Sequence, residues 1–263
     1  PTHAYQNHFE NVFVHGCGTG FHKQLMTSGS LHLGFSATAM HYVSVKPMEV
    51  PNHVHAVCAD VGSKTAFAEQ AAVDWENILL ARAAELVPGG RFICLNFGID
   101  AAGRYLGNTG GKHMFEHFHK YWRALHDKGR ITKGEYERAT FVQYYRTMEE
   151  FCAPFADPNS RVSRAGLILK AKHSKLTRCP YSTAFQDAGG RMSNREYAES
   201  LIPTMRSWSE TVFKTALTGR ESSEIDVIID EFYQAYSDEV GANPEGHAMD
   251  YVHIVLDIEK TVS

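Results

Sequence analysis

Hydrophobic positions follow a helical period through residues 65–86 and then give way to a short apolar run. The apolar side chains of this stretch recur at steps of three and four, which predicts a long amphipathic helix. Pro88, Gly89 and Gly90 end the pattern, and the apolar run at 92–97 predicts a strand buried on both faces of a largely parallel sheet. Helix, turn and buried strand form half of a βαβ unit, so the pattern favours an α/β fold.

Four further apolar runs predict strands. Two of them lie on either side of the turn-rich stretch GCGTG, at 12–14 and 31–35, and both are expected to be buried. The other two lie at 165–171 and 249–259, and the last of these closes the chain. The predicted sheet therefore draws strands from both ends of the sequence.

A layer of helices is predicted beside the sheet. Residues 112–146 are rich in charged and aromatic side chains at helical spacing, and the sequence Lys-Gly-Arg at 128–130 indicates a break between two helices. Two longer helical patterns follow at 194–217 and 222–240. We expect these helices to form an added layer rather than part of the sheet.

Composition narrows the class of protein. The 263 residues are 43% hydrophobic and 21% charged, which suits one large globular domain or a core with a subsidiary cap. A net charge of −4 disfavours a nucleic-acid partner, because such proteins gather a basic stripe. The five cysteines are scattered without C-x-x-C spacing, so we expect reduced thiols in a cytoplasmic protein. No apolar run reaches the roughly 18 to 20 residues that span a bilayer, so no membrane partner is expected.

Three stretches in order along the chain carry a family pattern. They are FVHGCGTGFHKQLMTSGSLHLGFSATAMHYVS at 13–44, AFAEQAAVDWENILLARAAELVPGGRFICLNFG at 66–98 and QYYRTMEEF at 143–151. Together they resemble the SABATH family, the salicylate, benzoate and theobromine type of carboxyl and N-methyltransferases. The resemblance implies a class I methyltransferase Rossmann-like sheet with a helical cap, S-adenosyl-L-methionine (SAM) as cofactor and a small-molecule acceptor. That acceptor would be a carboxylic acid or a ring nitrogen, and a homodimer would be in keeping with the family.

The resemblance also implies a sheet that is incomplete at its N-terminus. Family members hold the methionine and ribose of the cofactor with a Gly-rich loop and an acidic residue, and Pro1 corresponds to the position just beyond that acid. We expect an upstream segment in the natural protein, or one supplied by another chain, because the missing strands lie mid-sheet. On this pattern residues 1–104 form the remaining Rossmann-like core, 105–164 a helical cap insertion, and 165–263 the C-terminal core strands with further cap helices.

The family pattern assigns cofactor and substrate residues near the start of the chain. Gly20 and Phe21 occupy the place that contacts the adenine, on whose face an aromatic ring can stack; a structural turn with Phe21 in the core is the alternative. His41 and Tyr42 match a His-Trp pair that holds the acceptor carboxylate, with a phenol replacing the indole donor. Ordinary packing is the alternative for that pair. Thr38 falls where many members have a tyrosine facing the substrate.

Two later positions extend the comparison. Met114 and Phe115 correspond to an apolar pair that lines the substrate pocket of the family, although core packing explains their spacing equally well. Plant members often hold magnesium at an Asp-x-Phe-Asn stretch, and the corresponding residues here offer no carboxylate: Arg138, Ala139, Thr140 and Phe141. Without that hard oxygen ligand we expect no metal.

The expected reaction needs little chemical assistance from side chains. A sulfonium methyl donor is already activated, and a carboxylate acceptor is ionised at neutral pH, so no general base is required. We therefore expect no catalytic residue, only residues that position the acceptor against the donor in a dry pocket.

Two other functions are open on the sequence alone. His113, Glu116 and His117 fit the H-x-x-E-H pattern of inverted zinc peptidases, in which two histidines one helical turn apart ligate zinc. A methyltransferase-like fold without its cofactor loop could instead serve as a non-catalytic binding module. The upstream sequence distinguishes that module from an enzyme.

Overall fold

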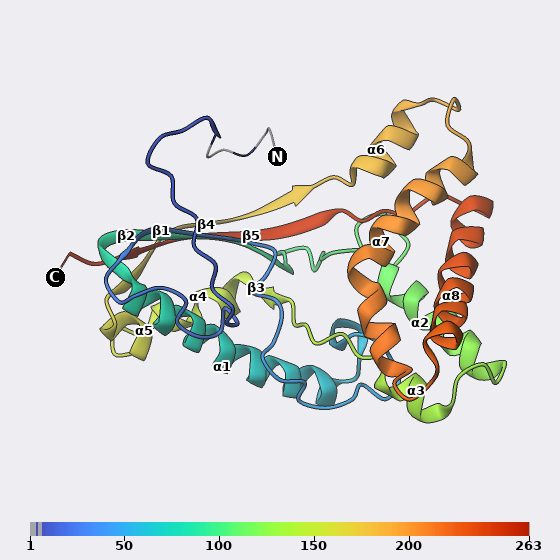
Figure 1. The fold of residues 1–263 in the computed structure, drawn as a ribbon, viewed down its shortest axis with the longest axis horizontal. Coiled ribbons are helices and arrows are strands. Elements are labelled where there is room, and N and C mark those ends of the chain that lie inside the picture. The colour runs from blue at the N-terminus through green and yellow to red at the C-terminus, as the bar shows by residue number, and fades with distance from the viewer. Residues whose placement is uncertain (1–3, 5–6, 263) are drawn as a thin grey trace.

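The computed structural model describes residue 4 and residues 7–262, which form a mixed sheet beside a layer of helices (Figure 1). The principal strands lie in the spatial order β1, β2, β5, β4, with bounds Leu31–Ala37, Leu86–Ile99, Tyr251–Lys260 and Leu167–Thr177. A two-residue strand, β3, pairs with the carboxyl end of β2 at Arg146–Thr147. The strands predicted at 31–35, 92–97, 165–171 and 249–259 are thereby confirmed.

The strand directions differ from the expected largely parallel sheet. β1 and β3 run parallel to β2, whereas β5 runs antiparallel to both β2 and β4. Apolar patterning reports burial and not direction, which is set by the connections between strands. The parallel part of the described sheet is β1, β2 and β3, and the carboxyl ends of these strands point the same way.

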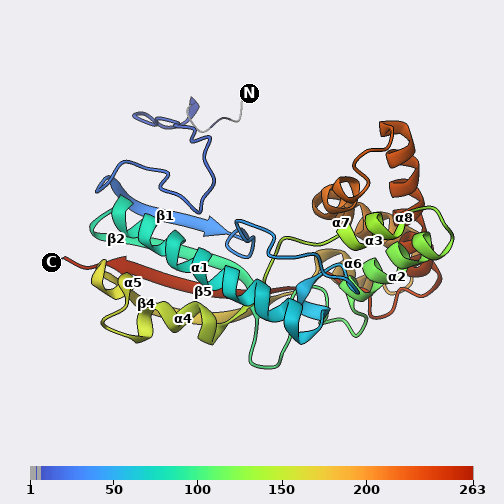
Figure 2. The same cartoon turned by 90° about the horizontal axis from the view of Figure 1, so that it is seen from below.

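One face of the sheet is covered by helices. The predicted long helix is confirmed as α1, Val61–Glu85, and it lies on this face with α4, Met148–Ala156, and α5, Arg161–Arg164 (Figures 1 and 2). Asp60 begins α1 by accepting the Ser63 N–H at 2.9 Å. Helix and sheet share one apolar cluster, which includes Trp75, Ile78, Leu79, Phe92 and Leu256.

β2 is not buried on both faces as its apolar run predicted. Phe92, Cys94 and Asn96 are buried, while the alternate residues between them are only half-buried. The strand also begins before the predicted turn, because the residues at 88–90 form a bulge within it. Gly90 is required there, since a Cβ atom would lie 2.9 Å from the carbonyl oxygens of Leu31 and Val87.

Residues 12–14 form no strand, contrary to the prediction. Phe13 is 79% exposed and Val14 59% exposed, and the backbone of this stretch pairs with no described strand. A short apolar run becomes a strand only where a neighbour completes its hydrogen bonds and covers its side chains. Neither condition is met here among the described residues.

The helical layer lies at the far end of the sheet, where the carboxyl end of β2 points (Figures 1 and 2). Its helices are α2, Met114–Asp127; α3, Lys133–Arg138; α6, Pro180–Asp187; α7, Asn194–Ala216; and α8, Ser222–Ala242. The predicted break at 128–130 is confirmed, with Gly129 at a φ of +70°. Aromatic side chains fill the core of the layer: Phe118, Trp122, Phe141, Phe213 and Phe232. Among the described residues, no helix has the length and apolar character needed to cross a membrane.

Candidate functional site

A cavity of about 180 Å³ lies where the carboxyl ends of β1 and β2 meet the helical layer. This is the edge at which open α/β sheets bind their ligands. Ten residues from six separate parts of the chain line it: Thr38, His41, Tyr42, Phe97, Leu106, Gln143, Tyr145, Trp208, Met249 and Tyr251. Three of the residues predicted from the sequence, Thr38, His41 and Tyr42, are thus brought together in one cavity.

The turn after β1 places these three side chains. Thr38 adopts a left-handed φ of +52°, and its N–H donates to the Leu95 carbonyl of β2 at 2.8 Å. The chain leaves the sheet at this point, so His41 and Tyr42 face the cavity rather than a neighbouring strand. The carbonyl of His41 accepts the N–H of Tyr144 at 2.8 Å, which joins the turn to the segment before β3.

His41 is a buried neutral imidazole. Its side chain lies against the rings of Tyr42, Phe97 and Tyr145, with centroids 4.4, 5.0 and 5.8 Å away. Burial, with a smaller effect from the charge of Arg146, lowers the pKa of His41 to about 3. Its Nδ1 has no hydrogen-bond partner. His41 therefore lines the cavity with a neutral ring that does not readily take up a proton.

Tyr42 is the more accessible member of the pair. Tyr42 is 39% exposed, and partial burial raises the pKa of its phenol above the usual value. The hydroxyl therefore stays protonated at neutral pH and can donate a hydrogen bond. An isolated bridge between Tyr42 and Gln143 holds the backbone of the turn.

Gln143 and Tyr145 were missed by reasoning from the sequence. The amide of Gln143 is buried, and its oxygen accepts the Tyr145 hydroxyl at 3.4 Å. Burial raises the pKa of Tyr145 well above its usual value. Both residues lie in the third stretch that resembles the family, and this resemblance could have indicated a role for them. Their spacing in the sequence does not show that they face residues 38–42.

Arg146 holds the turn after β1 in place through hydrogen bonds to backbone carbonyls. Its guanidinium is buried and donates to the carbonyl of Met40 at 2.6 Å and to the carbonyl of Ala71 in α1. Burial lowers the pKa of Arg146 to about 10, so the side chain remains charged at neutral pH. It thereby ties the residue before His41 to the helix that covers the sheet.

The predicted cofactor residues do not line the cavity. Gly20 is exposed, and Phe21 is half-buried against the cluster shared by α1 and the sheet. The carbonyl of Phe21 accepts from Nη1 of Arg82 at 3.2 Å. The next residue, His22, donates from Nε2 to the carbonyl of Tyr42 at 3.2 Å. The segment is thus attached directly to the turn that carries the predicted substrate residues.

Met114 and Phe115 stand one layer behind the cavity. Both are buried at the start of α2, within the core of the helical layer. The ring of Phe115 lies 4.3 Å from that of His55 and 6.1 Å from that of Tyr145, which does line the cavity. Their positions match the core-packing alternative, and neither side chain lines the cavity.

The H-x-x-E-H residues do not converge on one site. His113 lies 3.7 Å from Cys58 through Nε2, Glu116 faces His53, and His117 contacts Glu239 at 3.0 Å through Nε2. Each side chain therefore has a different set of neighbours. The zinc peptidase geometry is not formed.

Comparison with known proteins places this geometry in context. A family model described as "SAM dependent carboxyl methyltransferase" matches residues 2–261. No curated protein matches the chain.

Among solved structures, loganic acid methyltransferase with SAH is similar at a TM-score of 0.68 and 16% identity, over 98% of this chain and 70% of that chain. Geranyl diphosphate C-methyltransferase from Streptomyces coelicolor A3(2) matches at 10% identity over 92% of this chain and 53% of that one, with a TM-score of 0.31. The first likeness confirms the class I methyltransferase fold. Because the family match spans nearly the whole sequence, the chain belongs to the SAM dependent carboxyl methyltransferase family, and its cofactor is SAM.

Proposed function

We propose that this SAM-dependent methyltransferase transfers its methyl group to the carboxylate of a small molecule bound in the cavity, forming a methyl ester. Family membership supports methylation of a small molecule. The choice of a carboxylate rests on the chemistry of the cavity, which provides hydrogen-bond donors but no general base.

The absence of a base among the described lining residues is the observation that carries the proposal. His41 has a pKa of about 3, and the pKa values of Tyr42 and Tyr145 are raised. None of these groups readily removes a proton from an acceptor near neutral pH. A ring N–H acceptor must lose a proton on methylation, whereas a carboxylate is already ionised. The cavity therefore favours an acid over a ring nitrogen.

The size and lining of the cavity limit the acceptor. A cavity of about 150 Å³ accommodates benzene, so the 180 Å³ found here suits a molecule on the scale of a single ring. Phe97, Leu106, Trp208 and Met249 supply an apolar wall, while the polar groups gather at His41, Tyr42 and Gln143. We propose that the ring of the acid meets the apolar wall and its carboxylate meets the hydroxyl of Tyr42.

The cofactor supplies an electrophilic methyl group on a sulfonium. We propose that Phe21 contacts its adenine, because the half-buried ring belongs to the segment that His22 joins to the cavity turn. Gly20 fits this role, since no atom lies within 4 Å of the position of its Cβ and a ligand can approach its backbone. The side chains of the cavity then contribute by holding the acceptor and excluding water, a proximity effect that can lower a barrier by several kcal/mol.

We also propose that the protein acts in the cytoplasm, as a homodimer. The cysteines are all free thiols, which supports a reducing compartment. Dimerisation is supported by the family resemblance alone, and sedimentation at several protein concentrations tests it.

Product analysis tests the main proposal. The protein is incubated with SAM and a panel of monocyclic acids, each paired with the corresponding primary amide and a ring N–H compound of similar size. We expect methyl esters from one or more acids and no methylated product from the amides. Methylation confined to ring nitrogens would contradict the carboxylate assignment. Binding of S-adenosylhomocysteine without turnover of any compound in the panel would favour the non-catalytic module.

A further inference from the structure

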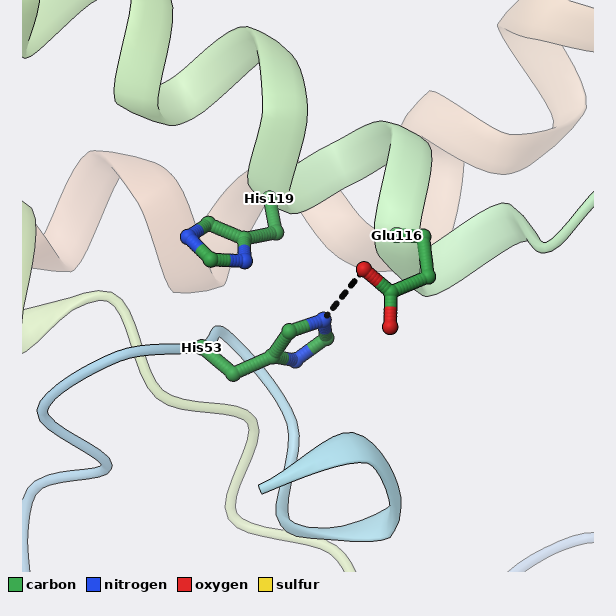
Figure 3. A group of neighbouring side chains, drawn as sticks. All are labelled: His53, Glu116 and His119. Carbon is green, nitrogen blue, oxygen red and sulfur yellow. Dashed lines mark ion pairs between the residues drawn. The ribbon is translucent and has the colours of Figure 1, made fainter. Parts of the chain in front are cut away.

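A group of possible metal ligands lies outside the proposed substrate site. His53 belongs to the loop before the short 3-10 helix Ala56–Cys58, while Glu116 and His119 stand one turn apart on α2 (Figure 3). One ligand atom from each residue lies within 4.8 Å of the others. The dashed line in Figure 3 marks the 3.6 Å separation of Nε2 of His53 from Oε2 of Glu116. Ligands held tetrahedrally around zinc lie about 3.3 Å apart, so small side-chain movements suffice.

His53 gives an independent indication of a ligand. Its side chain is only 5% exposed, yet Nε2 makes no hydrogen bond. Its nearest charged neighbour is the Glu116 carboxylate at 3.6 Å, and a buried polar atom that makes no hydrogen bond calls for an explanation such as an ion. Figure 3 shows Nε2 of this ring directed at the carboxylate of Glu116, with the ring of His119 nearby.

His119 is oriented as a metal ligand should be. Its Nε2 lies 2.7 Å from the hydroxyl of Tyr136, so the ring can keep its proton on that side and turn the Nδ1 lone pair toward His53.

A second group of two histidines and a glutamate differs from the first, because lysine side chains already contact its ligand atoms. His117, Glu239 and His247 also lie within reach of one another, but Lys120 donates to the carboxylate of Glu239. The ammonium of Lys112 lies 3.3 Å from Nε2 of His247. Two lysine charges thus already engage the ligand atoms of that group. Among the described residues, no lysine forms a hydrogen bond or ion pair with the three residues of the first group, where Glu116 provides the negative charge.

We propose that His53, Glu116 and His119 bind a divalent transition metal of the Zn²⁺ class, with water completing the coordination. Imidazole and carboxylate ligands suit such ions. Binding at Nε2 of His53 requires its Nδ1, which now accepts the His55 N–H at 3.1 Å, to carry the ring proton. That change leaves the buried N–H of His55 without its acceptor, which lowers the affinity by roughly 5- to 150-fold. The ion would tie the loop of His53 to α2.

Calorimetric titration of the 263-residue chain with ZnCl2 tests this proposal. We expect one equivalent to bind, and His119→Ala or Glu116→Gln to weaken binding by at least about tenfold. Glu116 has a 55% exposed side chain, so Glu116→Gln tests the site without threatening the fold. Tyr136→Phe should lower the affinity for Zn²⁺ by roughly tenfold, because it removes only the hydroxyl that orients His119.

The controls are His32→Ala, exposed on β1 and away from α2, and His247→Ala, in the second group. Both should bind Zn²⁺ as the unaltered protein does. The visible absorption of bound Co²⁺, lost in His119→Ala and kept in His32→Ala, gives a second readout. Failure of the unaltered chain to bind one equivalent, or equal weakening by either control, would overturn the proposal.

Discussion

At the scale of single residues, the turn after β1 concentrates the proposed chemistry. His41 and Tyr42 present a neutral imidazole and a protonated phenol to the same cavity, and Gln143 adds an amide. None of them removes a proton, which suits an acceptor that is already an anion. The two side chains differ in accessibility, since His41 is buried and Tyr42 is partly exposed.

Removing the hydroxyl of Tyr42 should weaken acid binding. Tyr42→Phe keeps the ring and deletes the donor, and losing a hydrogen bond to a charged group costs about 1.5 to 3 kcal/mol, or roughly 10- to 150-fold in kcat/KM. Tyr42→Trp should be the best tolerated large replacement, because its indole restores a donor. Steady-state kinetics with the acid measure both, while affinity for S-adenosylhomocysteine should change little.

Tyr144→Phe is the matched control for this experiment. The hydroxyl of Tyr144 donates to Glu150 at 2.6 Å, and the residue does not line the cavity. Its kcat/KM should stay close to that of the unaltered protein. An unchanged kcat/KM in Tyr42→Phe would remove Tyr42 from the site and weaken the case for an acid.

Arg146 should be important for both stability and substrate binding. Arg146→Met leaves the carbonyls of Met40 and Ala71 without their donors, at a cost of about 1 to 3 kcal/mol for each buried group. KM for the acid should also rise, because the turn that carries His41 loses its support. Urea unfolding and steady-state kinetics measure the two effects. Arg161→Met, which removes only a largely exposed pair with Glu76, should change neither.

At the scale of elements, the helices followed their sequence patterns more closely than the strands did. α1 and the break between α2 and α3 agree with prediction because helical contacts join residues three and four apart. The run at 12–14 formed no strand, and 88–90 became a bulge in β2 instead of a separate turn. Strand contacts depend on partners that are distant in sequence, so local patterns leave them undetermined.

The bulge in β2 can be tested by one added methyl group. Gly90→Ala places a Cβ against two backbone carbonyls that cannot move independently, so we expect a loss of about 1 to 3 kcal/mol in the free energy of unfolding. Gly18→Ala is the control, because no atom lies within 4 Å of its added carbon. Chemical denaturation compares the two variants. Equal stability of Gly90→Ala and the unaltered protein would show that the bulge adjusts freely.

At the scale of the whole molecule, the cavity joins the two layers. The sheet contributes the turn after β1 and the end of β2, while the helical layer contributes Trp208 of α7. Met249 and Tyr251 arrive from the last segment of the chain. Neither layer alone encloses the cavity, so relative movement of the layers would change its volume.

Buried histidines should make the whole protein sensitive to acid. The pKa of His41 falls to about 3 and that of His247 to about 4 on folding, chiefly through burial. The unfolded chain therefore takes up protons below pH 6.5 that the folded chain does not, and stability falls as the pH drops from about 6.5 towards 3. Through His41 alone, the step from pH 6.5 to 4 costs roughly 3 kcal/mol. Above pH 6.5 this contribution is fully present.

Urea unfolding at a series of pH values measures this dependence. His41→Gln should reduce the slope of stability against pH between 6.5 and 4, because it removes one of the groups that must protonate on unfolding. His8→Gln, at an exposed position, should leave the slope unchanged. The same slope in His41→Gln and in the unaltered protein would show that His41 is not held neutral by the fold.

The sequence by itself determined the α/β class, the main helices, most of the strands and the family, because these depend on local periodicity and on residues in a fixed order. It also singled out Thr38, His41 and Tyr42 as candidate substrate residues, which lie close together in the chain and line one cavity. Only the tertiary structure decided the mixed strand directions and the cavity. It brought Gln143 and Tyr145 to the turn after β1 and separated Glu116 from His117, because residues far apart in sequence meet through packing, which no local pattern encodes.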